Sequence, residues 1–191
     1  LAMLGSIIKD REDKGAGIVI TAIDCQKCFD VSHLTDNQAC LQMEGADKKA
    51  LKVLYKYQKH NKIRVKGSKE QFVIDDGIGQ GGVPAARMAT STLTEATTRH
   101  MDRLPEELNL VHREIVVNDQ GDVDDELLPS DNTQSAAATA ALYTDVLDEL
   151  GMKAHLEKSV QIITGAPEWR EEMQRQLEDH PSILQGCALK Q

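Results

Sequence analysis

Aromatic side chains are scarce in this chain, since Phe, Trp and Tyr together make up 3% of its 191 residues. A core must therefore be built from aliphatic side chains and Met, and hydrophobic residues still account for 40% of the chain. No apolar run approaches the roughly 20 residues that cross a bilayer as a helix. The apolar residues 1–8 lack the basic segment and cleavage site of a secretory signal. These absences predict a globular intracellular protein, in the cytoplasm or the nucleus, with no membrane partner.

Cysteine is sparse as well, and its four copies are too unevenly placed for a disulfide framework. Cys25 and Cys28 lie in an apolar context, which favours reduced thiols. With His33 they resemble the start of a zinc-binding spacing, but Cys40 follows at the wrong distance for the fourth ligand. A zinc-dependent nucleic-acid module stays an alternative, and a pair of buried thiols is the simpler interpretation.

An excess of positive charge is also missing, because the net charge is −9. This argues against a protein that coats nucleic acid over its whole surface. Residues 48–69 are the exception, with nine basic side chains and no acidic one. A one-sided basic helix followed by a basic strand is suited to binding phosphates. A solvated face balanced by acids elsewhere is the alternative. The predicted nucleic-acid-binding residues are Lys48, Lys52, Lys56, Lys59, Arg64 and Lys66.

The order of apolar patterns predicts one compact α+β domain without repeats or linkers. A buried strand at residues 18–23 ends at Asp24, and a helix near residues 137–150 ends at Gly151. Between and after them we expect helices near residues 47–57, 85–101 and 168–177, a hairpin of residues 63–66 and 71–74, and strands at residues 114–117, 124–128, 153–156 and 160–164.

The most informative local feature is the acidic stretch at residues 122–125, set between two apolar runs. Adjacent carboxylates at a turn repel each other, and such a pair usually persists because a cation neutralises it. If the strand that ends at Asp24 is a neighbour of this turn, the carboxylates converge. Mg²⁺ prefers such oxygen ligands, and two ions can activate a hydroxyl and stabilise a leaving phosphate. The alternative is that Asp24 caps a loop and that Asp124 and Asp125 form an exposed turn.

Two other patterns are weaker. The glycine-rich residues 77–82 lack the Lys and the spacing of a phosphate-binding loop. A calcium loop formed by Asp119, Asp122, Asp124 and Glu126 would lack its central glycine.

Several motifs in a fixed order resemble the palm of reverse transcriptases, particularly those of non-LTR retrotransposons. The resemblance covers residues 18–164, and its motifs are Asp24-Cys25-Gln26-Lys27-Cys28-Phe29-Asp30, Gly79-Gln80-Gly81, Val123-Asp124-Asp125, Leu150-Gly151-Met152-Lys153 and Glu157-Lys158-Ser159. It implies an α+β fold with an antiparallel palm-like sheet and helices packed on one face. Residues 1–191 would be a single palm-like domain with part of the fingers at residues 45–83, and the upstream fingers and the downstream thumb would be missing.

The resemblance also implies roles for individual residues. Asp24 and Asp124 match the metal-binding aspartates, with Asp125 as their acidic partner, and the cofactor would be Mg²⁺ or Mn²⁺. Phe29 matches the bulky position under the incoming sugar. Lys158 matches the lysine near the triphosphate, a proton donor to the leaving pyrophosphate. The loop residues that match the contacts to the incoming nucleotide are Gln80 and Gly81.

The expected function is RNA-directed DNA polymerisation, a nucleotidyl transfer with an RNA template, a DNA primer and a dNTP as partners. The remainder of a larger polyprotein would be a further partner. Asp122 departs from the family pattern because an aromatic residue usually stands there, and Ala85 and Ala86 replace the usual Ser-Pro. The alternative is therefore a degenerate or domesticated fragment that acts as a non-catalytic binding or scaffold module, so the sequence leaves open whether this chain is an enzyme.

Overall fold

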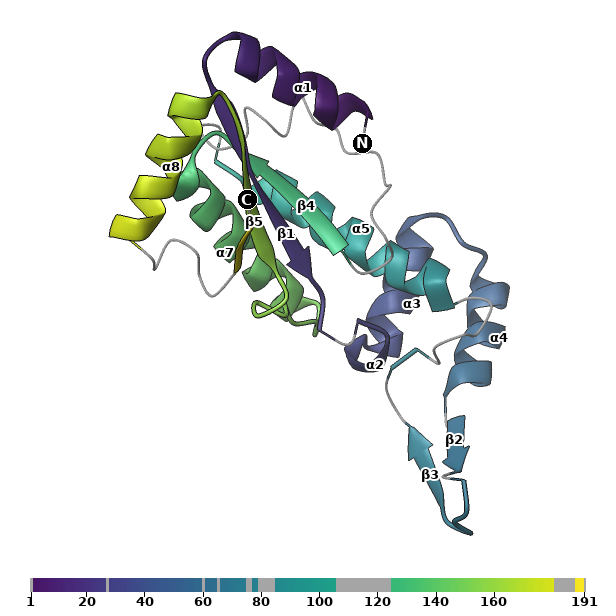
Figure 1. Cartoon of the computed structure of the whole chain (residues 1–191). Helices are drawn as coiled ribbons and strands as arrows, with labels where there is room; N and C mark the ends of the chain where they lie inside the picture. Colours follow the sequence, from purple (N-terminus) through teal and green to yellow (C-terminus); the bar gives the residue numbers. More distant parts are fainter. Residues whose placement is uncertain are drawn as a thin grey trace.

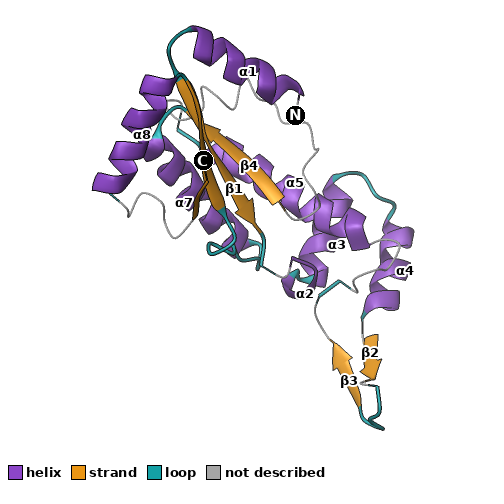
Figure 2. Cartoon of the chain, viewed as in Figure 1, coloured by secondary structure: helices purple, strands orange, loops and turns teal. Residues whose placement is uncertain are grey.

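The computed structural model describes residues 2–26, 28–59, 61–64, 66–74, 77–78, 85–105, 125–180 and 188–190. They form an α+β fold in which helices pack against an antiparallel sheet (Figures 1 and 2). The helices are α1 (Ala2–Asp13), α2 (Cys28–Val31), α3 (Leu34–Met43), α4 (Lys48–Gln58), α5 (Ala85–Arg103), α7 (Thr133–Glu149) and α8 (Pro167–Asp179). The strands are β1 (Gly17–Asp24), β2 (Asn61–Arg64), β3 (Gln71–Ile74), β4 (Asp125–Ser130), β5 (Val160–Gly165) and β6 (Ala188–Lys190).

The main sheet has the strand order β4-β1-β5-β6. β1 pairs antiparallel with both β4 and β5, and β6 adds to β5 in parallel. Among the described strands β4 lies at one edge of the sheet. Pro129 is tolerated there because proline has no N–H, and an edge strand needs no hydrogen bond to a second neighbouring strand. The central position of β1 explains why it is so apolar, since both its edges and much of both its faces are covered.

The hydrophobic core lies between the sheet and the helices α5 and α7. α7 contacts β1 and β4, α5 packs against α7, and α8 contacts β5. Ile23 of β1 and Leu128 of β4 join this core together with Tyr143, Val146 and Leu147 of α7. α1 contacts β1 and β5. As the sequence predicts, the core is mostly aliphatic.

The helix ends are set by local chemistry. The Asn132 side chain accepts a hydrogen bond from the Ser135 amide at 2.9 Å, which caps the start of α7. At the other end Gly151 has a φ of 72°, and the Met152 amide donates to the Leu147 carbonyl. This left-handed ending is the one that glycine favours. α7 therefore ends as expected, and it begins before residue 137.

The segment from α3 to β3 extends away from the sheet. α3 packs against both α4 and α5, and Asp47 caps α4 by accepting from the amides of Lys49 and Ala50. β2 and β3 pair only with each other and project as a separate ribbon (Figure 1). The expected hairpin is confirmed, with its first strand two residues earlier than predicted.

Most of the predicted elements are confirmed, with boundaries that differ by a few residues. The strand expected at residues 153–156 is wrong, because only Ala154 forms a single bridge, with Cys25, and residues 156–158 form a turn. α3 was not predicted, and the strand expected at residues 114–117 lies outside the described residues. None of the helices within the described ranges is both long enough and apolar enough to cross a membrane.

Candidate functional site

The register between β1 and β4 places Asp24 directly opposite Asp125. These are the last residue of β1 and the first residue of β4. The sequence suggested that Asp24 lies close to the acidic stretch. The structure places the backbones of Asp24 and Asp125 next to each other in this way. Like charges at directly opposite positions of a ladder are destabilising. A cation at this end of the sheet would offset that cost.

Lys158 supplies one positive charge at the same place. Its Nζ lies 3.8 Å from Oδ2 of Asp24, in the turn that precedes β5. The Lys158 side chain is 68% exposed and the Asp24 side chain 21% exposed. An ion pair this exposed contributes little to stability, because water screens it and the lysine loses conformational entropy. The ion pair matters because it places the Lys158 ammonium group beside the Asp24 carboxylate.

The backbone of Asp24 is fixed by the same turn. Its N–H donates to Oγ of Ser159 at 3.1 Å, and its carbonyl accepts from the His155 amide at 2.7 Å. The Ser159 hydroxyl donates in turn to the His155 carbonyl at 3.1 Å. The turn before β5 thus holds the end of β1 where the regular pairing with β5 has stopped. Asp24 has a defined position although it is the last residue of its strand.

Asp24 lies on the face of the sheet opposite to the helical core. Its neighbour Ile23 faces that core together with Leu128. Because side chains alternate along a strand, Asp24 lies on the other face.

Phe29, a further predicted site residue, contacts the start of the glycine-rich segment. Phe29, in α2, is partly buried against the core. Its carbonyl accepts a hydrogen bond from the Ile78 amide at 2.6 Å, and the Gly77 amide donates to the Ser32 carbonyl at 3.2 Å. A Cβ at Gly77 would collide with the Asp30 carbonyl, so glycine is needed for this approach. The chain just before Gln80 is therefore held against α2.

Other predicted site residues lie outside the described part of the chain. These are Asp124, Gln80 and Gly81, together with Asp122 and Asp119 of the weaker calcium pattern. Of the metal-ligand set, the structure describes Asp24 and the backbone of Asp125.

The predicted nucleic-acid-binding residues lie on a different part of the fold. Lys48, Lys52 and Lys56 are exposed on α4, and Lys59 follows it directly, with its Nζ 5.2 Å from the centre of the Tyr55 ring. Arg64 ends β2 and Lys66 lies in the turn after it. Figure 1 shows α4 and the hairpin beyond α2 and α3 as seen from the sheet. The cations are thus grouped, at a distance from the aspartates.

The zinc alternative gains nothing from the structure. Within the described ranges, no group of three or more His, Cys, Asp or Glu side chains is placed to hold a metal ion. Cys25 and Cys40 are buried and form no disulfide, whereas the simpler interpretation concerned the pair of Cys25 and Cys28. Burial raises the pKa of the Cys40 thiol, and the nearby Glu95 carboxylate raises it further. The Cys28 side chain lies outside the description.

Ser159 and His155 are the site residues whose roles sequence reasoning missed. Ser159 belongs to a quoted motif, but its hydrogen bond to Asp24 depends on a tertiary contact that no spacing reveals. His155 acts through its backbone, so its side chain carries no signal.

Neither a protein-family model nor a curated protein sequence matches this chain. A function must therefore be argued from the residues and their geometry.

Proposed function

We propose that this chain carries the catalytic part of an RNA-directed DNA polymerase of the reverse-transcriptase type. The observation that supports this most is the meeting of three distant segments at one end of the sheet. Asp24 ends β1, Asp125 begins β4 opposite it, and Lys158 approaches Asp24 from the turn before β5. In this proposal the sheet is a polymerase palm with its helices on one face, and residues 45–83 are part of the fingers.

The donor set at this end of the sheet fits a hard divalent cation. Asp24 offers a partly exposed carboxylate, and Asp125 stands opposite it in the ladder. Asp24 and Asp124 would hold Mg²⁺ or Mn²⁺, with Asp125 assisting, because these ions prefer oxygen ligands. When bound, the metal ions activate the attacking hydroxyl and neutralise charge on the phosphates.

Lys158 and Phe29 would act on the nucleotide. Phosphoryl transfer depends on positioning and charge neutralisation, which an exposed ammonium group next to the metal ligand can provide. Lys158 would also donate a proton from Nζ to the leaving pyrophosphate. Phe29 would support the sugar of the incoming dNTP, with Gln80 and Gly81 contacting the nucleotide. An RNA template and a DNA primer complete the reaction, and the chain would function within a larger polyprotein.

A primer-extension assay with Mg²⁺ tests this function. Asp24→Asn and Asp124→Asn keep the side-chain shape but remove the charge, and we expect each to abolish extension. Asp30→Asn is the matched control, because Asp30 is an exposed acid on the adjacent helix α2. We expect this variant to extend the primer as the wild type does. The proposal fails if the wild type does not extend the primer, or if extension continues without Asp24.

The alternative function, a non-catalytic binding module, is supported by a different observation. The exposed cations of α4 and the hairpin lie apart from Asp24 and need no metal. Nucleic-acid binding without any extension would favour this alternative.

A further inference from the structure

The charge of the chain is divided unevenly between two parts. Residues 45–83 hold nine basic and four acidic side chains, whereas the remainder holds 13 basic and 27 acidic ones. A polyanion would be attracted to the first part and repelled by the second. We call the exposed residues of α4, Lys59, β2, β3 and the turn between the two strands the finger surface.

The cations of the finger surface are available to a ligand. Within the described ranges, none of these nine basic residues forms an ion pair with a carboxylate. The hairpin tip also forms an open hollow of about 380 Å³, lined by Arg64, Lys66, Gly67, Ser68 and Lys69. Nε of Arg64 donates to the Ser68 carbonyl at 3.0 Å, which fixes the guanidinium group at the edge of this hollow.

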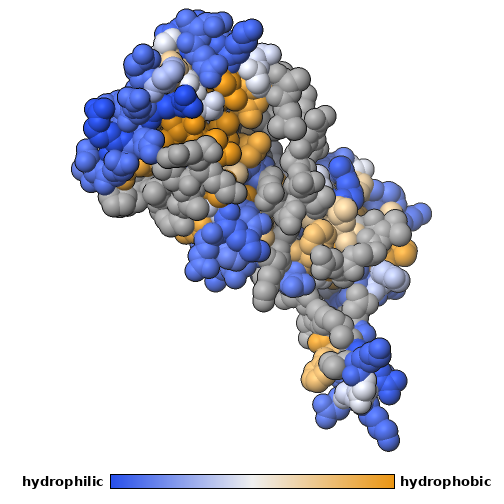
Figure 3. All heavy atoms as spheres, in the orientation of Figure 1, coloured by the Kyte–Doolittle hydropathy of each residue, from blue (hydrophilic) through white to orange (hydrophobic). Residues whose placement is uncertain are grey.

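The finger surface also exposes aromatic rings. Tyr57 on α4 is 72% exposed and Phe72 on β3 is 53% exposed, in a chain that has only six aromatic residues. Val73 beside Phe72 is 50% exposed. Figure 3 shows hydrophobic surface next to strongly hydrophilic surface on the projecting part of the molecule. Free aromatic faces among cations are the features that single-stranded nucleic acids bind.

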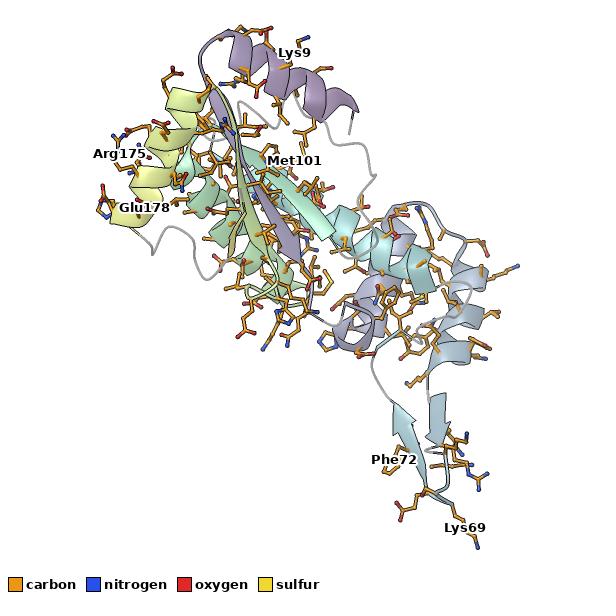
Figure 4. All side chains as sticks on the ribbon, in the orientation of Figure 1. Lys9, Lys69, Phe72, Met101, Arg175 and Glu178 are labelled. Carbon is orange, nitrogen blue, oxygen red and sulfur yellow. The ribbon has the colours of Figure 1, made fainter. Side chains whose placement is uncertain are left out.

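The hairpin register separates the two kinds of contact. Lys62 is opposite Val73 and Arg64 opposite Gln71, so both cations lie on one face of the ribbon. Phe72 alternates with them and lies on the other face. Figure 4 shows Phe72 pointing to one side of β3 and Lys69 at the tip. A ligand that crosses the tip, where the hollow lies, would contact both the ring and the cations.

We propose that the finger surface binds single-stranded nucleic acid across the hairpin tip. Phosphates would contact Arg64, Lys66 and Lys69, and unpaired bases would stack on Phe72 and Tyr57. A duplex offers phosphates but keeps its bases stacked internally, and inorganic polyphosphate has no bases at all. Neither ligand would use the exposed rings, which is why a single strand fits the surface better. The inference extends the nucleic-acid contact of the proposed function, but it needs neither the aspartates nor a metal.

Fluorescence anisotropy in EDTA tests the inference. The probes are labelled single strands of RNA and of DNA, about 15 nucleotides long to span one binding site, and a duplex of the same sequence. We expect either single strand to bind at least about 10-fold more tightly than the duplex. Running the test with Asp24→Asn as well as the wild type separates it from catalysis, because a protein that fails to extend a primer can still bind.

Variants of the finger surface identify the contacts. Phe72→Leu keeps an apolar side chain but removes the ring, and we expect it to weaken binding about 10-fold, whereas Phe72→Trp retains binding. Lys66→Gln should weaken binding and lower the salt dependence by about one counterion. Lys9→Gln is the matched control, since Lys9 is an exposed cation on α1 (Figure 4), and we expect it to bind as the wild type does.

Three results would overturn the inference. The first is equal affinity for the duplex and the single strands. The second is binding that is unaffected by both Phe72→Leu and Tyr57→Ala. The third is competition by inorganic polyphosphate that matches an unlabelled single strand, which would show that charge alone determines binding.

Discussion

The ammonium nitrogen of Lys158 lies 3.8 Å from a carboxylate oxygen of Asp24, where the turn before β5 contacts the end of β1. Because the lysine is exposed, Lys158→Ala should change the free energy of unfolding by less than about 0.5 kcal/mol. Under the proposed function Lys158 donates a proton to the leaving group, so the same substitution should slow single-nucleotide incorporation about 100-fold. Rapid-quench incorporation and thermal unfolding measure the two effects.

Lys158→Arg separates charge from proton donation in the same assays. A guanidinium group keeps the positive charge but does not give up a proton at any accessible pH. We therefore expect Lys158→Arg to bind dNTP normally and to remain slow. Incorporation by Lys158→Ala at the wild-type rate would contradict both parts of the prediction.

Removal of the Ser159 hydroxyl should destabilise the protein. Ser159 is 1% exposed, and its Oγ accepts from the Asp24 amide and donates to the His155 carbonyl. Ser159→Ala leaves the Asp24 amide without this partner, which costs about 1–3 kcal/mol, whereas the His155 carbonyl still accepts from the amides of Lys158 and Ser159. The control is Ser68→Ala in the exposed hairpin turn, where water can replace the hydrogen bond to the Glu70 amide. Urea unfolding curves that shift equally for the two variants would show that the Ser159 hydrogen bonds stabilise the protein no more than the exposed Ser68 hydrogen bond does.

Gly151 and Gly15 form a matched pair for testing steric contact. Both end a helix with a φ of 72°, but a Cβ at Gly151 would collide with the His33 ring, whereas Gly15 has open space. Alanine in this conformation costs about 1–2 kcal/mol by itself. We expect Gly15→Ala to lose about that much and Gly151→Ala to lose more. Combining Gly151→Ala with His33→Ala should recover the difference in thermal unfolding, and equal losses in the two single variants would contradict the contact.

The contact between α5 and α7 should weaken in acid. Arg103 donates to both carboxylate oxygens of Glu149, at 2.6 and 2.8 Å, and this hydrogen bonding lowers the pKa of Glu149 below its usual 4.5. A lowered folded-state pKa means that the stabilisation is present above pH 4.5. It is lost as the pH falls through the folded-state value. Carbon NMR titration of the Glu149 carboxyl group measures the shift.

Two variants test the same contact through stability. Glu149→Gln should flatten this part of the pH–stability profile, whereas Glu178→Gln, at an exposed acid of α8, should leave it unchanged. A Glu149 carboxyl group that titrates at its usual pKa of 4.5 or above would contradict the prediction.

The sequence predicted the elements whose signals are local. The apolar run before Asp24 predicted β1, and Gly151 predicted the end of α7. α3 was missed because its buried positions include Asn37, a polar residue that hydrophobic periodicity does not count. Asn37 is accommodated because its amide donates to the His33 carbonyl and the Thr92 hydroxyl donates to its oxygen. Both contacts depend on tertiary structure.

The candidate site was predictable as a set of residues but less so as an arrangement. Motif order selected Asp24, Asp125 and Lys158, yet only the strand register shows that the first two stand opposite each other. The prediction of a strand at residues 153–156 was wrong. These residues belong to a turn region that forms hydrogen bonds with the end of β1. The exposure of Phe72 and Tyr57 could not be predicted from the sequence either, since an aromatic residue in an alternating pattern normally indicates a core position.

The central place of β1 has a consequence for how the protein is made. β1 is formed by residues 17–24, but both strands that flank it come from residues 125–130 and 160–165. On the ribosome, this apolar strand therefore keeps both edges unpaired until residues 125–130 have emerged, and one edge unpaired until residues 160–165 follow. Such long-range pairing is slow and exposes the nascent chain to aggregation. Shortening the chain before β5 would leave Asp24 at the end of a strand that has lost one of its two neighbours.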